Sequence, residues 1–408
     1  MRICIVTIAG HGVGGMQDHT RDLARGLSAA NHDVEVITTR HPEGIRHEQR
    51  DGVTWHFVDA PGRHTRLPFH HPGWLAGSLS LFRRLHAQRP FDVVHSESTS
   101  AFELVRRGEH RRVPLVVEYH GTLLSLLRAA WGRARRGGAR ERLREAKSAI
   151  WLLAMHFERG ECFRFRGCEW IVPSQQQFED TRRGEFMVRS RGHVVANGVD
   201  TALFRPRERR EVRVELGLGE EPTLVSVGRL NVEKGVDVAI RSLAAVRRSI
   251  PDARLVIVGG GEQQGALEAL TSRLGLDSAV SFLGPQPAEQ VASYMAAADI
   301  FLFPTVRQEA APLVLPQAMA CGVPVIASRI GGITEVIGDT GEAGLLIPPG
   351  DERALEKRIE DLLADEGARK RLGHAARERV LAEYTLERMV ERTLRVYRHA
   401  IRRQAAGV

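Results

Sequence analysis

Two successive series of apolar segments, each alternating with helix-like segments, run along most of this chain. The first series comprises residues 2–8, 34–39, 91–95, 113–120 and 169–174. The second comprises residues 223–230, 253–261, 279–285, 299–305, 323–328 and 344–349. Buried parallel strands are short continuous apolar runs, and crossover helices join them. The pattern therefore predicts an α/β protein made of two doubly wound domains.

The junction between the two series carries a turn signal and then a charged stretch. The turn signal is NGVD at 197–200, and the charged stretch spans 205–213. We therefore expect a first domain over residues 1–204 and a second over residues 205–385. Because open α/β sheets bind ligands at the carboxyl ends of their strands, two such domains facing each other would form one cleft.

The last segment breaks the alternation of strands and helices. Between residues 386 and 404, apolar side chains recur at the spacing of one helical face, with basic residues elsewhere. This pattern predicts an amphipathic helix that packs against the surface of a domain.

Charge and cysteine content restrict the class of partner and the compartment. The chain of 408 residues has a formal net charge of +8, which favours an anionic partner, although an arginine-rich proteome explains it equally well. Cys4, Cys162, Cys168 and Cys321 include no CxxC pair, so we expect reduced thiols in a cytosolic protein and no structural zinc. No run of about 18 apolar residues occurs, so we expect no membrane span, and the first apolar segment is a core strand rather than a signal peptide.

Residues 128–147 are strongly basic, with eight Arg or Lys residues against two Glu. Two interpretations stay open: a solvated basic face, or a segment attracted to an anionic membrane surface. The second would place the protein at the inner face of the membrane rather than free in the cytoplasm. Because few aromatic residues lie between these arginines, we expect no nucleic-acid partner.

Glu309 follows a predicted strand and precedes a predicted helix. Pro312 and Pro316 are both tolerated if that helix begins near residue 312. The unpaired N–H groups of its first turn, at about Leu313 and Val314, would then face an anion. Since a carboxylate accepts hydrogen bonds from hydroxyls, a sugar joined to a phosphate explains both features. The alternative is a solvated loop Glu before an ordinary buried helix.

Two further motifs suit phosphate groups. Gly10, Gly12 and Gly15 form GxGxxG between a strand and a helix, which would indicate a dinucleotide, with NADP favoured because Arg40 ends the second strand. Arg229 and Lys234 follow the first strand of the second series, where two cations can hold a diphosphate. Taken alone, that pair would suit an exposed loop equally well.

Several of these motifs together resemble one enzyme family. GGM (14–16), HGT (120–122), NGVD (197–200), VGRLNVEKG (227–235), the Glu309 segment and GGITE (331–335) are similar to motifs of the retaining, nucleotide-sugar-dependent glycosyltransferases of family 4. The resemblance implies the GT-B fold: two Rossmann-like domains facing across a cleft, with residues 386–408 crossing back to the first domain. It also implies a nucleoside diphosphate sugar donor, such as a UDP-sugar, with no cofactor and no metal. The residues themselves do not fix the base.

The resemblance assigns roles residue by residue. Arg229 and Lys234 match the diphosphate-binding pair, Glu309 matches the carboxylate that contacts sugar hydroxyls, and His120 matches a histidine near the transferred sugar. A strand-end histidine satisfied by a neighbour is the alternative for His120. The expected donor contacts also include Gly14, Gly15, Leu313, Val314 and Gln317. The expected acceptor contacts are Gln17, Asp18, His19 and Glu97.

Gln317 departs from the family pattern. A second Glu, eight positions after the first, usually contacts the ribose of the nucleotide, and here that position is Gln317. Gln offers one acceptor and one donor group where a carboxylate accepts from both ribose hydroxyls. The interpretations are an active enzyme with altered ribose contacts and a degenerate site.

We therefore expect a retaining, metal-independent hexosyltransferase acting on a glycan or glycolipid acceptor in bacterial cell-envelope or polysaccharide biosynthesis. Three alternatives remain: a nucleotide-sugar epimerase of the same fold, an NADP-dependent oxidoreductase, and a noncatalytic nucleotide-sugar binder.

Overall fold

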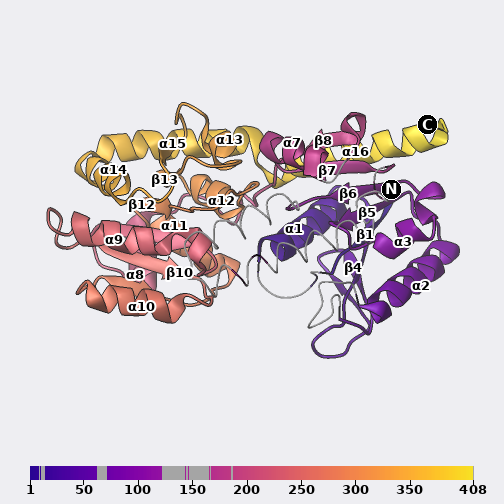
Figure 1. Ribbon diagram of the computed structural model, residues 1–408, viewed down its shortest axis with the longest axis horizontal. Helices are drawn as coiled ribbons and strands as arrows, with labels where there is room; N and C mark the ends of the chain where they lie inside the picture. Colours follow the sequence, from indigo (N-terminus) through magenta and orange to yellow (C-terminus); the bar gives the residue numbers. More distant parts are fainter. Residues whose placement is uncertain are drawn as a thin grey trace. The chain divides into compact units, whose positions relative to one another are not determined.

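The computed structural model describes residues 1–8, 10, 14–61, 71–121, 143, 146, 165, 167–184 and 187–407. The chain divides into two compact units (Figure 1). Unit 1 contains Met1–Gly198 and Leu386–Val408, and unit 2 contains Val199–Thr385. Each unit is built around one sheet that is parallel or nearly so, so the predicted α/β class with two Rossmann-like domains is confirmed.

Unit 1 has a sheet of eight strands in the order β3-β4-β2-β1-β5-β6-β7-β8. The strands are β1 (Arg2–Val6), β2 (Asp33–Thr38), β3 (His47–Arg50), β4 (Val53–Phe57), β5 (Val93–Glu97), β6 (Leu115–Glu118), β7 (Glu169–Val172) and β8 (Gly192–Val194). Neighbouring strands pair in parallel, apart from the antiparallel pair of β3 and β4 at one edge. The carboxyl ends of β1, β5 and β6 therefore lie side by side.

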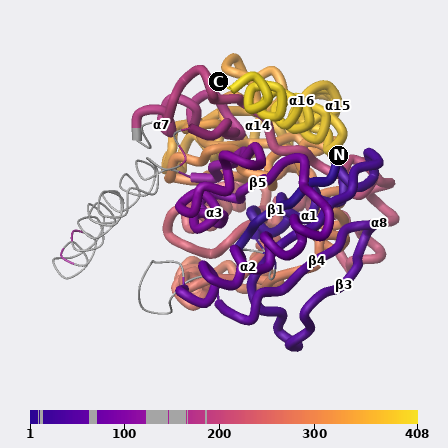
Figure 2. The backbone as a smooth tube through the Cα atoms, turned by 90° about the vertical axis from the view of Figure 1, so that its right-hand side faces the viewer, coloured from indigo at the N-terminus to yellow at the C-terminus, as the bar shows by residue number. Residues whose placement is uncertain are grey.

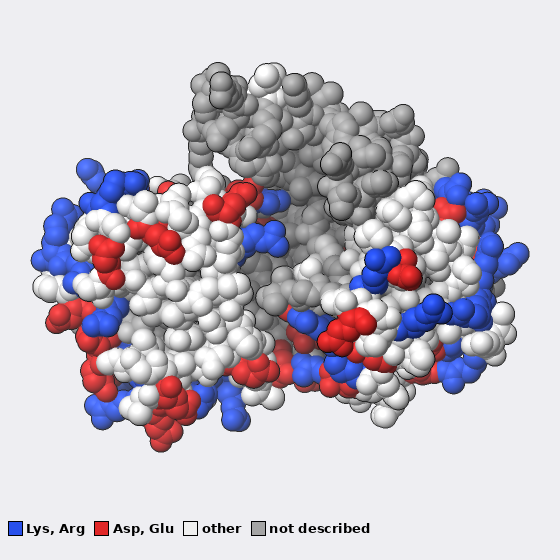
Figure 3. All heavy atoms as spheres, turned by 90° about the horizontal axis from the view of Figure 1, so that it is seen from below, with Lys and Arg blue, Asp and Glu red and all other residues white. Residues whose placement is uncertain are grey.

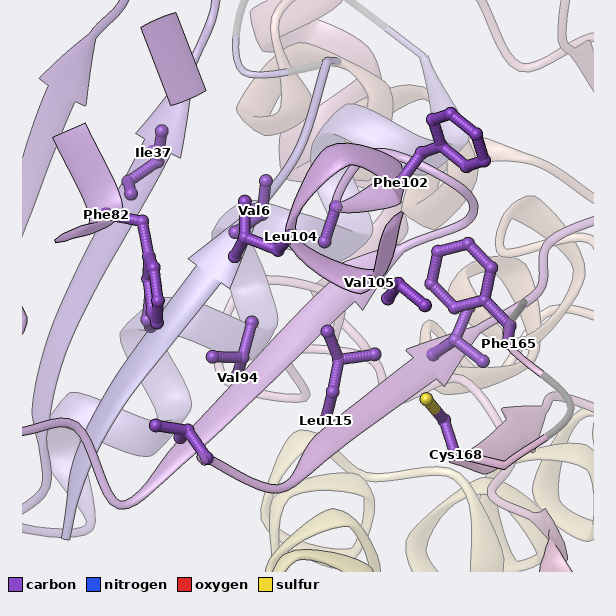
Figure 4. Close-up of a cluster of buried hydrophobic side chains, with 14 of the residues drawn as sticks. Val6, Ile37, Phe82, Val94, Phe102, Leu104, Val105, Leu115, Phe165 and Cys168 are labelled. Atoms are coloured by element: carbon purple, nitrogen blue, oxygen red, sulfur yellow. The ribbon is translucent and has the colours of Figure 1, made fainter. Parts of the chain in front are cut away.

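Helices cover both faces of this sheet because successive strand residues point to opposite sides. The helices are α1 (Gly15–Ala29), α2 (Pro72–Gln88), α3 (Phe102–Arg106), α7 (Gln175–Gly184) and α16 (Leu386–Ala405). On one face Val94 and Leu115 pack with Phe82 of α2 and Leu104 of α3 (Figure 4). On the other face, Val93 and Val116 belong to the core formed by α1 and α16.

Helix α16 returns to unit 1 after the whole of unit 2 has been traversed. Its predicted apolar stripe is buried, and Met389, Leu394 and Tyr397 pack in one core with Leu23 of α1. The N-terminal strand and the C-terminal helix consequently lie close together in both views (Figures 1 and 2). The amphipathic pattern of this helix is explained by contact with unit 1.

Unit 2 has a six-stranded parallel sheet in the order β11-β10-β9-β12-β13-β14. The strands are β9 (Thr223–Val227), β10 (Arg254–Val258), β11 (Val280–Phe282), β12 (Ile300–Phe303), β13 (Val325–Ser328) and β14 (Leu345–Ile347). The helices are α8 (Arg209–Leu216), α9 (Val236–Val246), α10 (Gln264–Arg273), α11 (Ala288–Ala297), α12 (Val314–Ala320), α13 (Ile333–Ile337), α14 (Glu352–Ala364) and α15 (Glu366–Glu383). One core joins the sheet to α11, α12 and α15, and another joins it to α9, α10 and α14. Both faces are therefore covered.

The units meet at residues 198 and 199, whereas the sequence suggested a limit after residue 204. Val199 is 2% exposed and pairs with Thr385, and Phe204 packs in the core of unit 2. The turn signal at 197–200 therefore marks the boundary itself, and the segment after it belongs to unit 2.

Among the described residues, no helix combines the length and the hydropathy needed to cross a bilayer.

Candidate active site

Two loops of unit 2 are joined at the carboxyl end of its sheet. The first follows β9 and contains Lys234, and the second follows β12 and contains Glu309. The Glu233 carbonyl accepts hydrogen bonds from Val306 N at 2.9 Å and from Thr305 Oγ1 at 2.9 Å. These bonds hold together two segments that are about 70 residues apart in sequence.

Gly235 explains why the loops can approach so closely. It has a φ of 65°, and a Cβ at this position would lie 2.1 Å from the carbonyl oxygen of Pro304. Any other residue would clash with that backbone and would also be strained in the left-handed region. The glycine of GRLNVEKG is thus a packing requirement as well as a turn residue.

This contact brings the predicted cation and carboxylate together. Lys234 Nζ donates to Glu309 Oε1 at 2.8 Å and lies 5.3 Å from the ring centroid of Phe303. Their side chains are 23% and 19% exposed, so a ligand can reach both. Lys234 also lines a small pocket with Gly228, Leu230 and Phe303. Arg229 stands at the same strand end and is exposed.

The GGITE segment supports the backbone of Glu309. Gly332 N donates to the Glu309 carbonyl at 2.8 Å. Gly331 has a φ of 59°, and a Cβ there would lie 2.4 Å from the same oxygen. The two glycines therefore allow the turn after β13 to lie against the loop after β12.

Helix α12 begins at Val314, with Leu313 as its N-cap residue. Leu315 N donates to the Pro312 carbonyl at 3.2 Å and Gln317 N to the Leu313 carbonyl at 3.1 Å. Both prolines thus lie before or within the first turn, as the sequence predicted. Gln317 stands one turn further along and is half-buried.

A buried group of histidines and glutamates lies at the carboxyl end of the unit 1 sheet. Glu97 ends β5, Glu118 ends β6, and both are essentially unexposed. His120 Nε2 contacts Glu97 Oε2 at hydrogen-bonding distance. His19 of α1 lies 3.1 Å from Glu118 Oε1 through its Nε2, and its ring is 4.8 Å from that of His120.

The charges of this group depend on one another. Burial alone would lower the pKa of His19, but the Glu118 carboxylate raises it to about 9. Burial alone would raise the pKa of Glu97, but the neighbouring His120 holds it well below its usual range. The pKa of Glu118 is likewise lowered by His19 despite burial. Each carboxylate is thus stabilised as an anion by a histidine.

Comparisons with known proteins decide the family. The model described as Glycosyltransferase Family 4 matches residues 13–203, and the model described as Glycosyl transferases group 1 matches residues 208–379. The D-inositol 3-phosphate glycosyltransferase of Acidothermus cellulolyticus is 32% identical over 415 residues, covering 96% of this chain and 88% of that protein. The chain belongs to glycosyltransferase family 4.

Two more relatives extend this family 4 assignment. The GDP-mannose-dependent alpha-(1-6)-phosphatidylinositol monomannoside mannosyltransferase of Mycolicibacterium smegmatis is 38% identical over 188 residues, covering 44% of this chain and 49% of that protein. Sucrose-phosphate synthase from Thermosynechococcus elongatus has a TM-score of 0.76 at 26% identity and covers 98% of both chains. The GT-B fold expected from the family 4 motifs is confirmed.

Family 4 membership removes the basis of the dinucleotide alternative. The GxGxxG match included Gly12, which lies outside the described residues. Arg40, which would have met an NADP phosphate, pairs with Asp59 at 2.5 Å on the surface. Gly14 precedes α1 and Gly15 opens it, as expected of a turn that leads into a helix.

The four residues expected to contact an acceptor differ in how far they are exposed. His19 and Glu97 are 2% and 0% exposed, so an acceptor cannot touch them in this structure. Gln17 is half-buried, and Asp18 is paired with Arg21 on the outer side of α1. The buried pair can act on a substrate only through another residue, and His120, whose side chain is 14% exposed, is the partly exposed one among the described side chains that it contacts.

Three residues of the buried group were missed from the sequence: His95, Glu118 and Tyr397. Tyr397 Oη and His95 Nδ1 are 2.9 Å apart, although 302 residues separate them along the chain. Polar residues at the ends of apolar strands, as in HSE and EYH, were the available signal for the first two. Nothing local in the sequence of α16 indicates the partner of Tyr397.

Proposed function

We propose that this family 4 member transfers a hexosyl unit from a nucleoside diphosphate sugar to an acceptor hydroxyl with retention of the anomeric configuration. The observation that carries the proposal is the 2.8 Å contact between Lys234 and Glu309. It puts a cation suited to a diphosphate beside a carboxylate suited to sugar hydroxyls. In this proposal unit 2 holds the donor.

The chemistry needs no nucleophile from the protein. The bond between the anomeric carbon and the diphosphate oxygen breaks, the acceptor oxygen bonds to that carbon on the same face, and the acceptor proton passes to the leaving diphosphate. Arg229, Lys234 and the N–H groups at the start of α12 would stabilise the charge that develops on the leaving group. This arrangement requires no metal at the reacting bond, because these cations take its place.

The remaining residues would orient the substrates. Glu309 would accept hydrogen bonds from the sugar, Gln317 would contact the ribose, and Gly14 and Gly15 would allow backbone to approach the diphosphate. We assign His120 to the transferred sugar because its HGT segment resembles the family 4 motif. We assign His19 and Glu97 to holding His120 through the contacts described above, and Gln17 and Asp18 to the acceptor side.

The activities named for two relatives suggest a class of acceptor. One acts on an inositol phosphate and the other on a phosphatidylinositol mannoside. We therefore propose a polyol or sugar hydroxyl on a glycan or glycolipid acceptor, in cell-envelope or polysaccharide synthesis. The second relative uses GDP-mannose, so GDP-mannose stands beside UDP-sugars as a candidate donor.

A two-stage experiment on the full-length protein tests the function. Thermal-shift titrations with UDP-glucose, UDP-N-acetylglucosamine and GDP-mannose identify the donor as the one that raises the melting temperature most. Release of the nucleoside diphosphate and the product mass are then measured with inositol phosphate and phosphatidylinositol acceptors, and proton NMR reads the anomeric configuration. Transfer with retention is expected.

Other outcomes of that experiment would indicate a different function or mechanism. Donor binding without release of nucleoside diphosphate for any acceptor would identify a noncatalytic binder. A new nucleotide sugar formed without acceptor would identify an epimerase. An inverted product would refute the proposed mechanism while leaving the family intact.

We also propose that the protein acts at an anionic membrane surface through residues 128–147. Apart from Leu143 and Ala146, this segment lies outside the described residues. On the face drawn in Figure 3, both basic and acidic side chains occur on the described surface of each unit. The segment 128–147 is proposed for membrane attraction because it carries six net positive charges.

A further inference from the structure

Two carboxylates and two imidazoles converge in the interior of unit 1. Glu97 and His95 are 0% exposed, Glu118 is 1% exposed and His19 is 2% exposed. They come from the carboxyl ends of β5 and β6 and from α1. Burying two carboxylates side by side is costly unless positive charge compensates both of them.

The facing atoms of this group are close together but do not form hydrogen bonds. His95 Nε2 lies 3.4 Å from Glu118 Oε2 and 3.6 Å from Glu97 Oε1. His19 Nε2 lies 3.1 Å from Glu118 Oε1 and 3.9 Å from Glu97 Oε1. Within the described part of the chain, both Nε2 atoms, Glu97 Oε1, Glu118 Oε1 and His19 Nδ1 are buried without a hydrogen-bond partner. Buried polar atoms rarely lack partners, and here five occur in one group, of which all but His19 Nδ1 face one another.

A shared metal ion accounts for this geometry. Nitrogen and oxygen ligands about 2.0–2.1 Å from a tetrahedral cation are separated from one another by roughly 3.3 Å. The contacts above span 3.1 to 3.9 Å, and the lone pairs of ligands point at the ion rather than at each other. His95, Glu97 and Glu118 offer ligand atoms that all lie within 4.8 Å of one another. One divalent ion would also balance the charge of two carboxylates.

His95 has the outer contact that metal-binding histidines usually have. Its Nδ1 is 2.9 Å from the buried Tyr397 Oη of α16. With the proton on Nδ1 donated to Tyr397, the lone pair of Nε2 is directed toward the carboxylates. Because a tyrosine hydroxyl can accept a hydrogen bond, the C-terminal helix is compatible with the tautomer that coordination requires.

We propose that His95, Glu97 and Glu118, with His19, form a buried site for one divalent metal ion of the zinc class. Two imidazole nitrogens and two carboxylate oxygens are a ligand set that zinc accepts. The ion would hold Glu97 through Oε1, while Glu97 Oε2 contacts His120. It therefore acts as a positioning element beneath His120 and takes no part in the transfer step.

A second group in unit 1 contains Glu169, His193 and His399 but is less suited to a cation. Glu169 already accepts from His193 at 2.8 Å. The guanidinium groups of Arg191 and Arg403 lie 3.5 Å and 3.7 Å from the same carboxylate. Two neighbouring positive charges would repel an ion there, so this group serves as the internal control.

The test is the metal content of the full-length protein, purified without chelator and without a histidine tag. Elemental analysis should give about one equivalent of zinc-class metal per chain. After chelator dialysis, Zn²⁺ should raise the melting temperature, and Co²⁺ should give the intense visible bands of a tetrahedral site. Glu118→Gln should weaken metal binding at least about tenfold, whereas His193→Gln should leave it unchanged.

A protein that is metal-free as purified and shows neither response would overturn the proposal, because protons would then balance the carboxylates. Loss of metal in His193→Gln and not in Glu118→Gln would also overturn it. Should Glu118→Gln fail to fold, Tyr397→Phe retains every ligand, and about tenfold weaker Co²⁺ binding is expected. Unchanged Co²⁺ affinity in Tyr397→Phe would contradict the role of His95.

Discussion

At the scale of single residues, Lys234 and Glu309 are counter-ions to each other while no donor is bound. In the proposed function, a diphosphate would compete for the ammonium group of Lys234, and both oxygens of Glu309 would then be available to hydroxyls. Because both side chains are partly exposed, the ion pair itself adds little to stability. We expect its role to be the orientation of the two proposed binding groups before the substrate arrives.

Replacing Lys234 by Ala should therefore reduce turnover by about 100-fold or more, because a cation that stabilises the leaving group is lost. The melting temperature should change little. Lys357→Ala is the matched control, since Lys357 is exposed on α14. Steady-state kinetics with the identified donor and differential scanning fluorimetry give the two readouts. Full activity in Lys234→Ala would show that the diphosphate binds elsewhere.

The substitution Gln317→Glu tests whether the natural ribose contact is altered but functional, or impaired. If Gln317 serves an active site, restoring the carboxylate should change kcat/KM by no more than about tenfold, the size of one exchanged hydrogen bond. The comparison is made with each donor separately, because the ribose contact is common to all of them. An increase by several orders of magnitude would instead mark the natural site as degenerate.

At the scale of elements, the strands of unit 1 are tied together by Glu35 of β2. Its carboxylate accepts from Arg2 Nε of β1 at 2.9 Å and contacts His56 Nε2 of β4 at 2.8 Å. Burial alone would raise the pKa of Glu35, but the hydrogen bonds from His56 and Arg2 lower it. One side chain thus connects three adjacent strands.

The pH dependence of stability follows from that lowered pKa. A carboxylate whose folded pKa lies below its unfolded value of about 4.3 stabilises the fold above that pH. The contribution is lost as the pH falls through the folded pKa. Glu35→Gln should therefore lower the melting temperature at pH 7, and the difference from the natural protein should shrink below about pH 4. Glu43→Gln, an exposed control, should show no such trend.

The elements that the sequence predicted well are those with continuous apolar runs. The runs at 34–39 and 299–305 correspond to β2 and β12 within one or two residues. The edge pair β3 and β4 was missed, because HEQR is polar and exposed and only alternate residues of β4 are fully buried. Apolar runs reveal strands buried on both faces and overlook half-exposed antiparallel ones.

The two candidate sites also differ in how far the sequence could predict them. Lys234 and Glu309 could be paired in advance, because each follows a strand and the strands end at one edge of a parallel sheet. The cluster of His95, Glu118 and Tyr397 depends on a contact between residues that are 302 positions apart. No local pattern encodes such a contact, and the expectation of no structural zinc rested on the lack of a CxxC pair and of a histidine at ligand spacing along the sequence.

At the scale of the whole molecule, the proposed attraction to anionic membranes depends on a segment that lies mostly outside the described residues. If 128–147 attracts anionic surfaces, the protein should co-sediment with vesicles containing about 30% phosphatidylglycerol, and salt should release it, because each basic residue near such a surface contributes about 1 kcal/mol. Neutral phosphatidylcholine vesicles are the control lipid. Changing Arg133, Arg135, Arg136 and Arg140 to Ser should reduce binding. Equal binding to both vesicle types would contradict membrane attraction through charge.

The ends of unit 2 meet, since Val199 pairs with Thr385. The flanking ends of unit 1 also meet, because Gly198 N lies 3.0 Å from Met389 Sδ. Residues 199–385 are therefore inserted into the chain of unit 1, whose two segments meet on either side of the insertion. Recombination at the two junctions, 198/199 and 385/386, can exchange unit 2 for that of another gene without separating the two ends of unit 1 that flank it. In the proposed function, in which unit 2 holds the donor and unit 1 the acceptor, such an exchange would change the sugar preference and leave the acceptor side in place.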